Sequence, residues 1–326
     1  MLNINNQTTP LISLLMFCIT LTFSSLSKAT SINDVDHQEV TIWSQGVRLA
    51  ADIYKPKGLT ATQKLPGILL VPGWGGSKEN LKKNYGPHFA ELGFIVLAFD
   101  YKSWGQSDGP IVPTDALPHS EEAAKLDINV THIRKVVEPF SMLADVRAAL
   151  YYLGGEPQVM PNNLGIWGTS LGAGLAMVMA ASDDRIKVLV DQMGPVNYVH
   201  NLREMPIAMA RKIETLTARG ILPPYPDASM AKNPALKGYP NWAAMKRFNP
   251  INYVDQLNVP TLIIDAENET LFDRSQNGVL LHNSIKDRLD AKYIAYPGGH
   301  YDLYKGDNQK AAFKEAAVWL VKYLKP

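Results

Sequence analysis

Cysteine is almost absent from this sequence of 326 residues, since Cys18 is the only thiol. The absence excludes an internal disulfide framework and a zinc site built from cysteines. Charge of either sign is not in excess, because 32 basic side chains face 31 acidic ones, and a net charge of +1 gives no electrostatic basis for binding nucleic acid or an anionic membrane. The patterns H-E-x-x-H, C-x-x-C and G-x-x-x-x-G-K are also missing. We therefore predict a protein that uses no metal, no cofactor and no nucleic acid.

The N-terminal apolar run, Leu11–Phe23, has 13 residues, whereas a helix needs roughly 20 to cross a bilayer. That length is typical of the core of a signal peptide, and Ser27-Lys28-Ala29 provides small residues for cleavage. No Lys or Arg precedes the run, so an uncleaved membrane anchor or an apolar leader on a cytoplasmic protein is the alternative. We expect residues 1–29 to be a signal peptide and residues 30–326 to form an exported domain, periplasmic or secreted, with no membrane attachment after cleavage.

After the leader, 46% apolar residues supply a large core. Two strand-like segments flank the hairpin signal Gln45-Gly46, and short apolar runs then alternate with longer amphipathic stretches. The expected strands after the hairpin are Gly67–Val71, Phe94–Phe99, Leu164–Trp167, Ile186–Val190, Thr261–Ile264 and Lys292–Ala295. The expected helices are Glu79–Leu92, Glu138–Leu153, Leu171–Ala181, Arg274–Lys286 and Asn308–Leu324. This alternation predicts an α/β domain with a mostly parallel, eight-stranded sheet covered by helices on both faces.

One segment interrupts the alternation. Residues 195–250 contain eight prolines and no clear strand. Structureless loops of that length are uncommon in compact domains, so we predict a small, mostly helical insertion that acts as a lid. Its methionine and aromatic side chains either line an apolar substrate site or pack the lid onto the core.

The segment Gly168-Thr169-Ser170-Leu171-Gly172 carries the strongest chemical signal. It follows the expected strand Leu164–Trp167 directly and precedes an expected helix. The pattern G-x-S-x-G in that context is typical of a nucleophile elbow, in which small neighbours allow a strained serine backbone. The alternative is a glycine-rich turn whose serine caps the helix. The context favours Ser170 as a nucleophile.

A serine hydroxyl needs a base that accepts its proton and an acid that orients the base. In elbow-type hydrolases the acid and then the histidine follow the serine along the chain. His282 falls inside an expected helix, whereas His300 follows Pro297-Gly298-Gly299 just after the last expected strand. We therefore predict His300 as the base.

The acid is expected just after the strand Thr261–Ile264. The candidates there are Asp265, Glu267, Glu269 and Asp273. Asp265 lies at the strand end itself, while Glu269 is far enough along the loop to reach His300. We choose Glu269 as the acid and Asp273 as the second candidate; a solvated acidic loop is the alternative to both.

Acyl transfer also needs N–H donors that stabilise the oxyanion. One is expected from the backbone of Leu171, the residue after the nucleophile. The other is expected from the glycine-rich loop Val71–Gly76, where we choose the backbone N–H of Trp74. The same loop also fits a tight turn from strand to helix.

Taken together, these motifs resemble the α/β-hydrolase superfamily in order and spacing over most of Val40–Leu324. The matching segments are PGWGG (72–76), FDYKSWGQSDG (99–109), GTSLG (168–172) and PGGH (297–300). The segment GVRLAADIYKP (46–56) is similar to the dienelactone-hydrolase-like and X-prolyl-peptidase-like branch. The resemblance implies that Ser170, Glu269 and His300 occupy the triad positions, although an aspartate is more usual than Glu269.

The expected activity is hydrolysis of a small-molecule carboxylic ester through an acyl-enzyme. An amidase or peptidase is the first alternative, because esters and amides share the same tetrahedral intermediate. A binding protein that keeps the scaffold without catalysis is the second. The sequence predicts neither the acyl and alcohol groups nor the oligomeric state.

Overall fold

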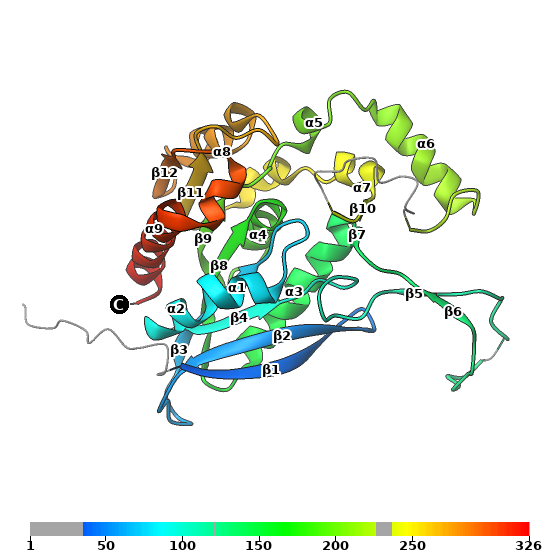
Figure 1. Ribbon diagram of the computed structural model, residues 1–326, viewed down its shortest axis with the longest axis horizontal. Helices are drawn as coiled ribbons and strands as arrows, with labels where there is room; N and C mark the ends of the chain where they lie inside the picture. The colour runs from blue at the N-terminus through cyan, green and yellow to red at the C-terminus, as the bar shows by residue number, and fades with distance from the viewer. Residues whose placement is uncertain (1–34, 120, 226–236, 326) are drawn as a thin grey trace, which may run out of the picture.

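The computed structural model describes residues 35–119, 121–225 and 237–325, so the expected signal peptide lies outside the described residues. A single eight-stranded sheet forms the centre of the molecule, in the order β1-β2-β4-β3-β8-β9-β11-β12 (Figure 1). Its strands are β1 (Val35–Ser44), β2 (Val47–Pro56), β3 (Leu65–Val71), β4 (Ile95–Phe99), β8 (Val159–Thr169), β9 (Ile186–Gln192), β11 (Thr261–Ala266) and β12 (Ala291–Tyr296). Pairing is antiparallel for β1–β2 and β2–β4 and parallel elsewhere. The prediction of a mostly parallel α/β-hydrolase sheet is confirmed.

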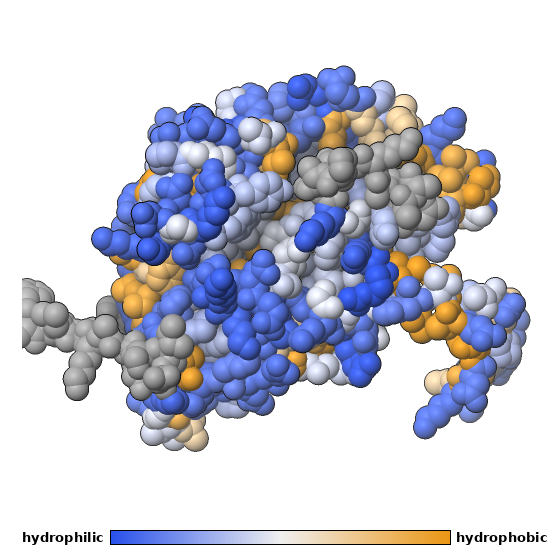
Figure 2. Space-filling model, viewed as in Figure 1, coloured by the Kyte–Doolittle hydropathy of each residue, from blue (hydrophilic) through white to orange (hydrophobic). Residues whose placement is uncertain are grey.

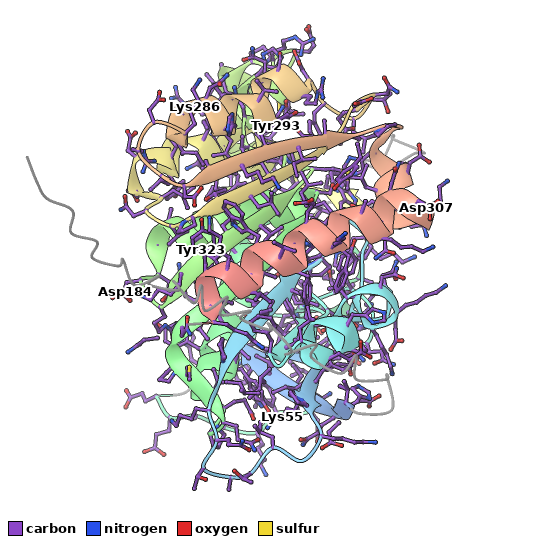
Figure 3. All side chains as sticks on the ribbon, turned by 90° about the vertical axis from the view of Figure 1, so that its left-hand side faces the viewer. Lys55, Asp184, Lys286, Tyr293, Asp307 and Tyr323 are labelled. Carbon is purple, nitrogen blue, oxygen red and sulfur yellow. The ribbon has the colours of Figure 1, made fainter. Side chains whose placement is uncertain are left out.

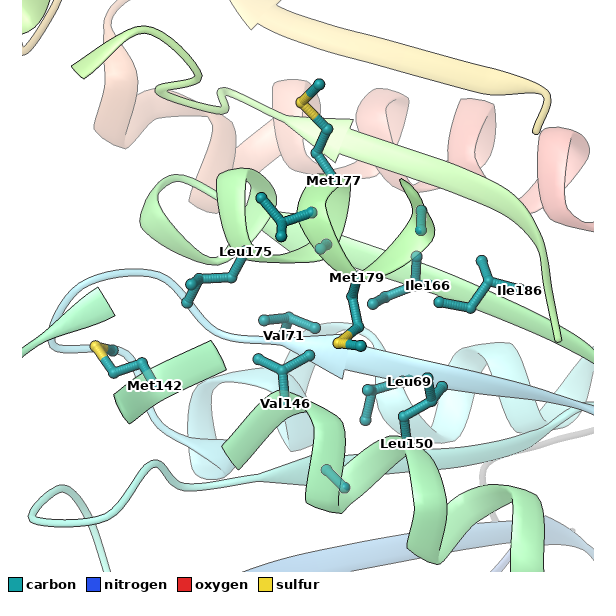
Figure 4. Close-up of a cluster of buried hydrophobic side chains, with 14 of the residues drawn as sticks. Leu69, Val71, Met142, Val146, Leu150, Ile166, Leu175, Met177, Met179 and Ile186 are labelled. Atoms are coloured by element: carbon teal, nitrogen blue, oxygen red, sulfur yellow. The ribbon is translucent and has the colours of Figure 1, made fainter. Parts of the chain in front are cut away.

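Helices cover both faces of the sheet, because side chains of successive strand residues point to opposite sides. In β3, Leu69 and Val71 pack with α3 (Pro139–Gly155) and α4 (Leu171–Ser182) (Figure 4). Ile68 and Leu70 belong to the opposite core, which contains α1 (Lys78–Asn84), α2 (Gly86–Glu91) and α9 (Gly306–Leu324). Figure 3 shows α9 lying across that face, with Asp307 near one end and Tyr323 near the other. Helix α8 (Gly278–Ile285) packs with the first core.

The single helix expected over Glu79–Leu92 is instead two helices, α1 and α2. Tyr85 leaves helical geometry between them, with φ −139° and ψ −53°. A Cβ at Gly86 would lie 2.6 Å from the Tyr54 ring, so the chain can approach β2 only with glycine at this position. The break at Tyr85 therefore lies next to a close glycine contact that periodicity does not reveal.

The predicted insertion is mostly helical in its described part. It comprises α5 (Tyr198–Asn201), α6 (Ile207–Ala218), the short strand β10 (Tyr239–Pro240), α7 (Trp242–Arg247) and the 3₁₀ helix η3 (Pro250–Gln256). The Lys246 ammonium donates to the carbonyls of Val199 and Leu202 and ties α7 to α5. Strand β10 pairs with β7 (Val136–Val137), so the insertion is joined to the segment that precedes α3.

A second excursion from the sheet was not predicted. Strands β5 (Ile111–Pro113) and β6 (Val130–His132) form a two-stranded hairpin that projects from the body (Figure 1). Neither strand joins the large sheet. Among the described helices, none is long and apolar enough to cross a bilayer.

Candidate active site

Ser170 lies at the sharp turn between β8 and α4. Its backbone has φ 52° and ψ −130°, a conformation that non-glycine residues rarely adopt. The Ser170 N–H donates to the carbonyl of Gln192, at the end of the neighbouring strand β9, over 2.8 Å. Strand, strained serine and helix follow one another as the nucleophile elbow requires.

Three glycines allow this turn. A Cβ at Gly168 would lie 2.5 Å from the carbonyl oxygen of Gly172, and one at Gly172 would lie 2.3 Å from that of Pro72. A Cβ at Gly73 would lie 3.1 Å from the Cβ of Ser170. The elbow and the loop after β3 therefore pack backbone against backbone. Gly174 in α4 allows a similar close approach, because a Cβ there would lie 2.8 Å from the carbonyl oxygen of Pro195.

His300 and Glu269 come together from the loops after two neighbouring strands. Glu269 follows β11, and His300 follows β12 as the first residue of the 3₁₀ helix η5 (His300–Tyr304). His300 Nδ1 lies 2.5 Å from Glu269 Oε2, and each side chain is only 2% exposed. The backbone N–H of Leu271 donates to the other carboxylate oxygen over 2.8 Å. Both oxygens of the Glu269 carboxylate therefore have a hydrogen-bond partner.

The other acidic candidates are engaged elsewhere. Asp273 Oδ1 accepts hydrogen bonds from the backbone and hydroxyl of Ser275, and its Oδ2 lies 3.7 Å from His200. Asp265 is buried and accepts a hydrogen bond from Tyr293. Glu267 is exposed. Of the four candidates, the geometry joins Glu269 alone to His300.

Ser170 and His300 both line one cavity of about 690 Å³ at the carboxyl end of the sheet. The loop Pro72–Gly76 and Leu271 form part of its wall. Five Trp and Tyr residues belong to its lining, and they are Trp74, Tyr85, Trp167, Tyr301 and Tyr304. Its size lies within the range of about 300–1,000 Å³ that small-molecule sites occupy.

Of the two residues expected to provide oxyanion donors, Trp74 lines the same cavity, and Leu171 directly follows Ser170, which also lines it. Leu171 is the first residue of α4, so its N–H has no carbonyl partner four residues earlier within the helix. Trp74 lies in the loop that Gly73 holds against the elbow. The Trp74 ring turns toward the insertion, where its Nε1 donates to the carbonyl of Lys237 over 2.5 Å and the ring lies 5.9 Å from that of Trp242.

A buried ion pair anchors the segment after the Trp74 loop, and sequence reasoning did not find it. Lys78 Nζ lies 3.1 Å from Asp52 Oδ1 in β2, and both side chains are almost completely buried. The Lys78 N–H also donates to Asp100. Burial alone would raise the pKa of Asp52, but hydrogen bonds from His37 and Lys78 outweigh this effect and lower it. Asp52 in β2 and Asp100 after β4 thus hold the start of α1 in place.

Two further carboxyls lie buried behind the elbow. Burial raises the pKa of Asp191 to about 7, and the charge of Asp265 adds to the shift. Burial also raises the pKa of Asp265 to about 7. Asp191 Oδ1 accepts the N–H of Gly194. Neither residue lines the cavity with Ser170, and only the three-dimensional pairing of β9 with β11 brings them together.

Within residues 35–119, 121–225 and 237–325, no group of three or more His, Cys, Asp and Glu side chains is arranged to hold a metal ion. His119 and His132, which are 13 positions apart, lie in the β5–β6 hairpin region. His132 Nε2 accepts the backbone N–H of Gly109, so this histidine has a structural contact.

Comparison with known proteins identifies the family of the chain and supports the fold. The family model described as X-Pro dipeptidyl-peptidase (S15 family) matches residues 45–302. Quorum-quenching protein AidA of Acinetobacter baumannii is 24% identical over 310 residues, which cover 85% of this chain and 92% of that protein.

Solved structures resemble the whole described domain. A hypothetical protein of Pseudomonas aeruginosa superimposes with a TM-score of 0.68 at 21% identity, covering 91% of this chain and 95% of the other. An esterase of Pyrococcus furiosus superimposes with a TM-score of 0.59 at 15% identity, covering 90% and 92%. At these identities the structures establish a common fold.

Proposed function

Because the chain belongs to the X-Pro dipeptidyl-peptidase (S15) family and is a hydrolase of the α/β-hydrolase fold, we propose that it hydrolyses carboxylic esters of small molecules through a serine acyl-enzyme. The observation that carries the proposal is the His300–Glu269 contact of 2.5 Å at a cavity that Ser170 also lines. A nucleophile, a base and an orienting acid are the groups that this chemistry requires.

In the proposed mechanism, Glu269 holds His300 through Nδ1, which leaves Nε2 as the nitrogen that accepts the Ser170 proton. The Ser170 oxygen attacks the acyl carbon, and the resulting oxyanion is stabilised by the backbone N–H groups of Leu171 and Trp74. The alcohol departs with the proton from His300. Water then attacks the acyl-enzyme with His300 as base, and the carboxylic acid and free Ser170 are regenerated.

The test compares Ser170→Ala with Ser182→Ala, which alters a hydroxyl at the far end of the same helix, where Ser182 Oγ donates to the Val178 carbonyl. With a short activated ester, we expect turnover of Ser170→Ala to fall by several orders of magnitude, since members of a triad act as one unit. We expect Ser182→Ala to stay near wild type. A fluorophosphonate should label the wild-type chain and Ser182→Ala but not Ser170→Ala. Turnover of Ser170→Ala within tenfold of wild type would exclude this mechanism.

Peptide-bond hydrolysis is the second candidate, because the family model is that of a dipeptidyl-peptidase. Esters and amides use the same nucleophile, so the choice depends on leaving-group protonation and on the fit of the substrate. We favour esters because aromatic residues line the cavity together with Ser170 and can contact an apolar acyl or alcohol group. Matched ester and anilide substrates with one acyl group distinguish the two, and a higher kcat/KM for the anilide would overturn the ester proposal.

We also propose that residues 1–29 direct export of the chain. The support is the apolar run Leu11–Phe23 followed by small residues. Cell fractionation and N-terminal sequencing of the mature protein test this proposal. Recovery of the intact N-terminus in the cytoplasm would contradict it.

A further inference from the structure

The β5–β6 hairpin and its tip, residues 111–132, form an arm. The rest of the chain shields very little of this arm from solvent. Every described residue from 114 to 132 is exposed. Five of the exposed side chains are large and apolar, and they are Ile111, Leu117, Leu126, Ile128 and Val130, with exposed fractions between 40% and 59%. An isolated two-stranded hairpin is only marginally stable in water, and exposed apolar patches of this kind mark interaction surfaces.

The root of the arm is fixed to the body. Arg134 donates to the backbone carbonyls of Ser107 and Gly105, and the Ile133 N–H donates to the carbonyl of Pro110 over 2.8 Å. The Lys135 N–H donates to the carbonyl of Ser103, also over 2.8 Å. These contacts give the arm a defined direction where it leaves the domain.

Helix α6 and its C-terminal turn form a second apolar surface. Ile207, Met209 and Ile221 are exposed by 43%, 52% and 65%, and Ala210 is the one buried residue of the helix. Figure 1 shows that α6 and the arm project at the same end of the long axis, separated by a gap. Figure 2 shows hydrophobic surface along the arm and near α6.

The two surfaces carry opposite charge. The arm has four acidic residues and one lysine over 111–132, a net charge of −3. Residues 203–219 have four basic and two acidic residues, a net charge of +2. Glu214 pairs with Arg247. Within the described chain, no ion pair is formed by Arg211, Lys212 or Arg219 on this surface, nor by Asp115, Glu121 or Asp127 on the arm.

We propose that the chain forms a two-fold symmetric dimer in which the arm of each copy packs on α6 of the other. When two complementary surfaces lie at the same end of one chain, a two-fold symmetric dimer contains two equivalent contacts, each between the first surface of one copy and the second surface of the other. A stable interface takes about 20–30 residues from each partner, and the arm with 22 residues and α6 with 12 contain enough residues for such an interface. A negatively charged arm is repelled by anionic lipid, which favours a second copy over a membrane. The proposal is independent of the hydrolase chemistry.

The first test is the mass in solution of the wild-type chain by light scattering at micromolar concentration. We expect twice the mass of one chain. Leu126→Asp and Ile128→Asp should each raise the dimer dissociation constant about 30-fold or more, the effect of losing an interface hot spot. The control is Val318→Asp, which changes an apolar residue on α9 that is even more exposed (60%) than Leu126 or Ile128 and should remain dimeric. Circular dichroism verifies that each variant is folded.

A second test identifies the contact surfaces. Ile128→Cys and Met209→Cys are introduced separately into differently tagged chains in a Cys18→Ser background, and the chains are mixed and treated with a bismaleimide. A covalent dimer that carries both tags is expected. A monomeric wild-type chain, a dimer insensitive to the arm substitutions, or a dimer without the mixed cross-link would overturn the proposal. Flotation of a monomer with anionic vesicles, lost in Ile128→Asp, would assign the arm to a membrane instead.

Discussion

Glu269 Oε2 lies 2.5 Å from His300 Nδ1, although the two residues come from loops after different strands. The carboxylate is also held by the Leu271 N–H, and Phe272 packs edge-on against the imidazole with ring centroids 5.9 Å apart. The imidazole also contacts the rings of Tyr301 and Tyr304, so its orientation is set by one hydrogen bond and three aromatic contacts. This arrangement directs the second ring nitrogen away from the acid, as proton transfer from Ser170 requires.

The position of the acid yields a prediction that separates two neighbouring carboxylates. Glu269→Gln keeps the size of the side chain but removes the charge that orients His300, so kcat for a short ester should fall by about 10³ to 10⁴. Asp273→Asn is the matched control, because Asp273 contacts Ser275 rather than His300, and it should retain activity within a few-fold. Steady-state measurement of kcat for both variants and the wild type tests this prediction. Equal losses in both variants would argue against the assignment of Glu269.

The glycine before the elbow should tolerate no side chain. A Cβ at Gly168 would meet the carbonyl oxygen of Gly172 at 2.5 Å and the Cα of Ala173 at 2.7 Å, so the backbone has to shift. We expect Gly168→Ala to cost about 1–3 kcal/mol of unfolding free energy and to reduce ester turnover at least tenfold. Gly155→Ala is the control, since a Cβ there meets nothing within 4 Å. Urea denaturation of both variants measures the difference.

The buried ion pair at the start of α1 should contribute to folding. Lys78→Met removes the ammonium 3.1 Å from Asp52 and leaves that buried carboxylate with His37 and the Tyr54 hydroxyl as its partners. The expected loss of unfolding free energy is about 3–5 kcal/mol. Lys82→Met on the same helix should change stability by less than about 0.5 kcal/mol. Adding Asp52→Asn to Lys78→Met should recover part of the loss; if it makes folding weaker still, the explanation by an unpaired charge is wrong.

The carboxyls of Asp191 and Asp265 predict a dependence of stability on pH. Their folded-state pKa values are raised to about 7 from 3.8, so the folded chain binds more protons than the unfolded chain between these pH values. The stabilisation that these two protonated carboxyls add to the unfolding free energy is therefore complete below about pH 4 and declines as pH rises toward 7. Asp191→Asn should lessen the decline between pH 4.5 and 7.5 by an amount on the order of 2 kcal/mol.

Denaturation midpoints at several pH values, compared between wild type and Asp191→Asn, isolate this contribution from other titrating groups. Asp307→Asn is the control, because the Asp307 side chain is 99% exposed. It should give a pH profile parallel to that of wild type. A profile of Asp191→Asn that also runs parallel to wild type would show that Asp191 does not retain its proton on folding.

The sequence alone determined the order of strands and helices and the identity of Ser170 and His300 as candidates. Both results follow from local rules: apolar periodicity fixes the elements, and a small-residue turn between strand and helix marks an elbow. The sequence did not decide between Glu269 and Asp273 as the acid, because the path of the loop after β11 determines which carboxylate can contact His300. The break at Gly86 and the arm at 111–132 were missed, since neither produces a change in apolar period.

Only the tertiary structure decided which distant groups meet. The contact of Glu269 with His300, the closeness of Gly73 to Ser170 and the pairing of Lys78 with Asp52 all join segments from different strands or their loops. The first two contacts arise because parallel strands bring their carboxyl ends to one edge of the sheet, wherever they stand in the chain. The third arises because α1 packs against β2, a strand that is antiparallel to its neighbours. Residue type and spacing determine which secondary structure each segment can form. Packing of the sheet and its helices determines which other segments it contacts.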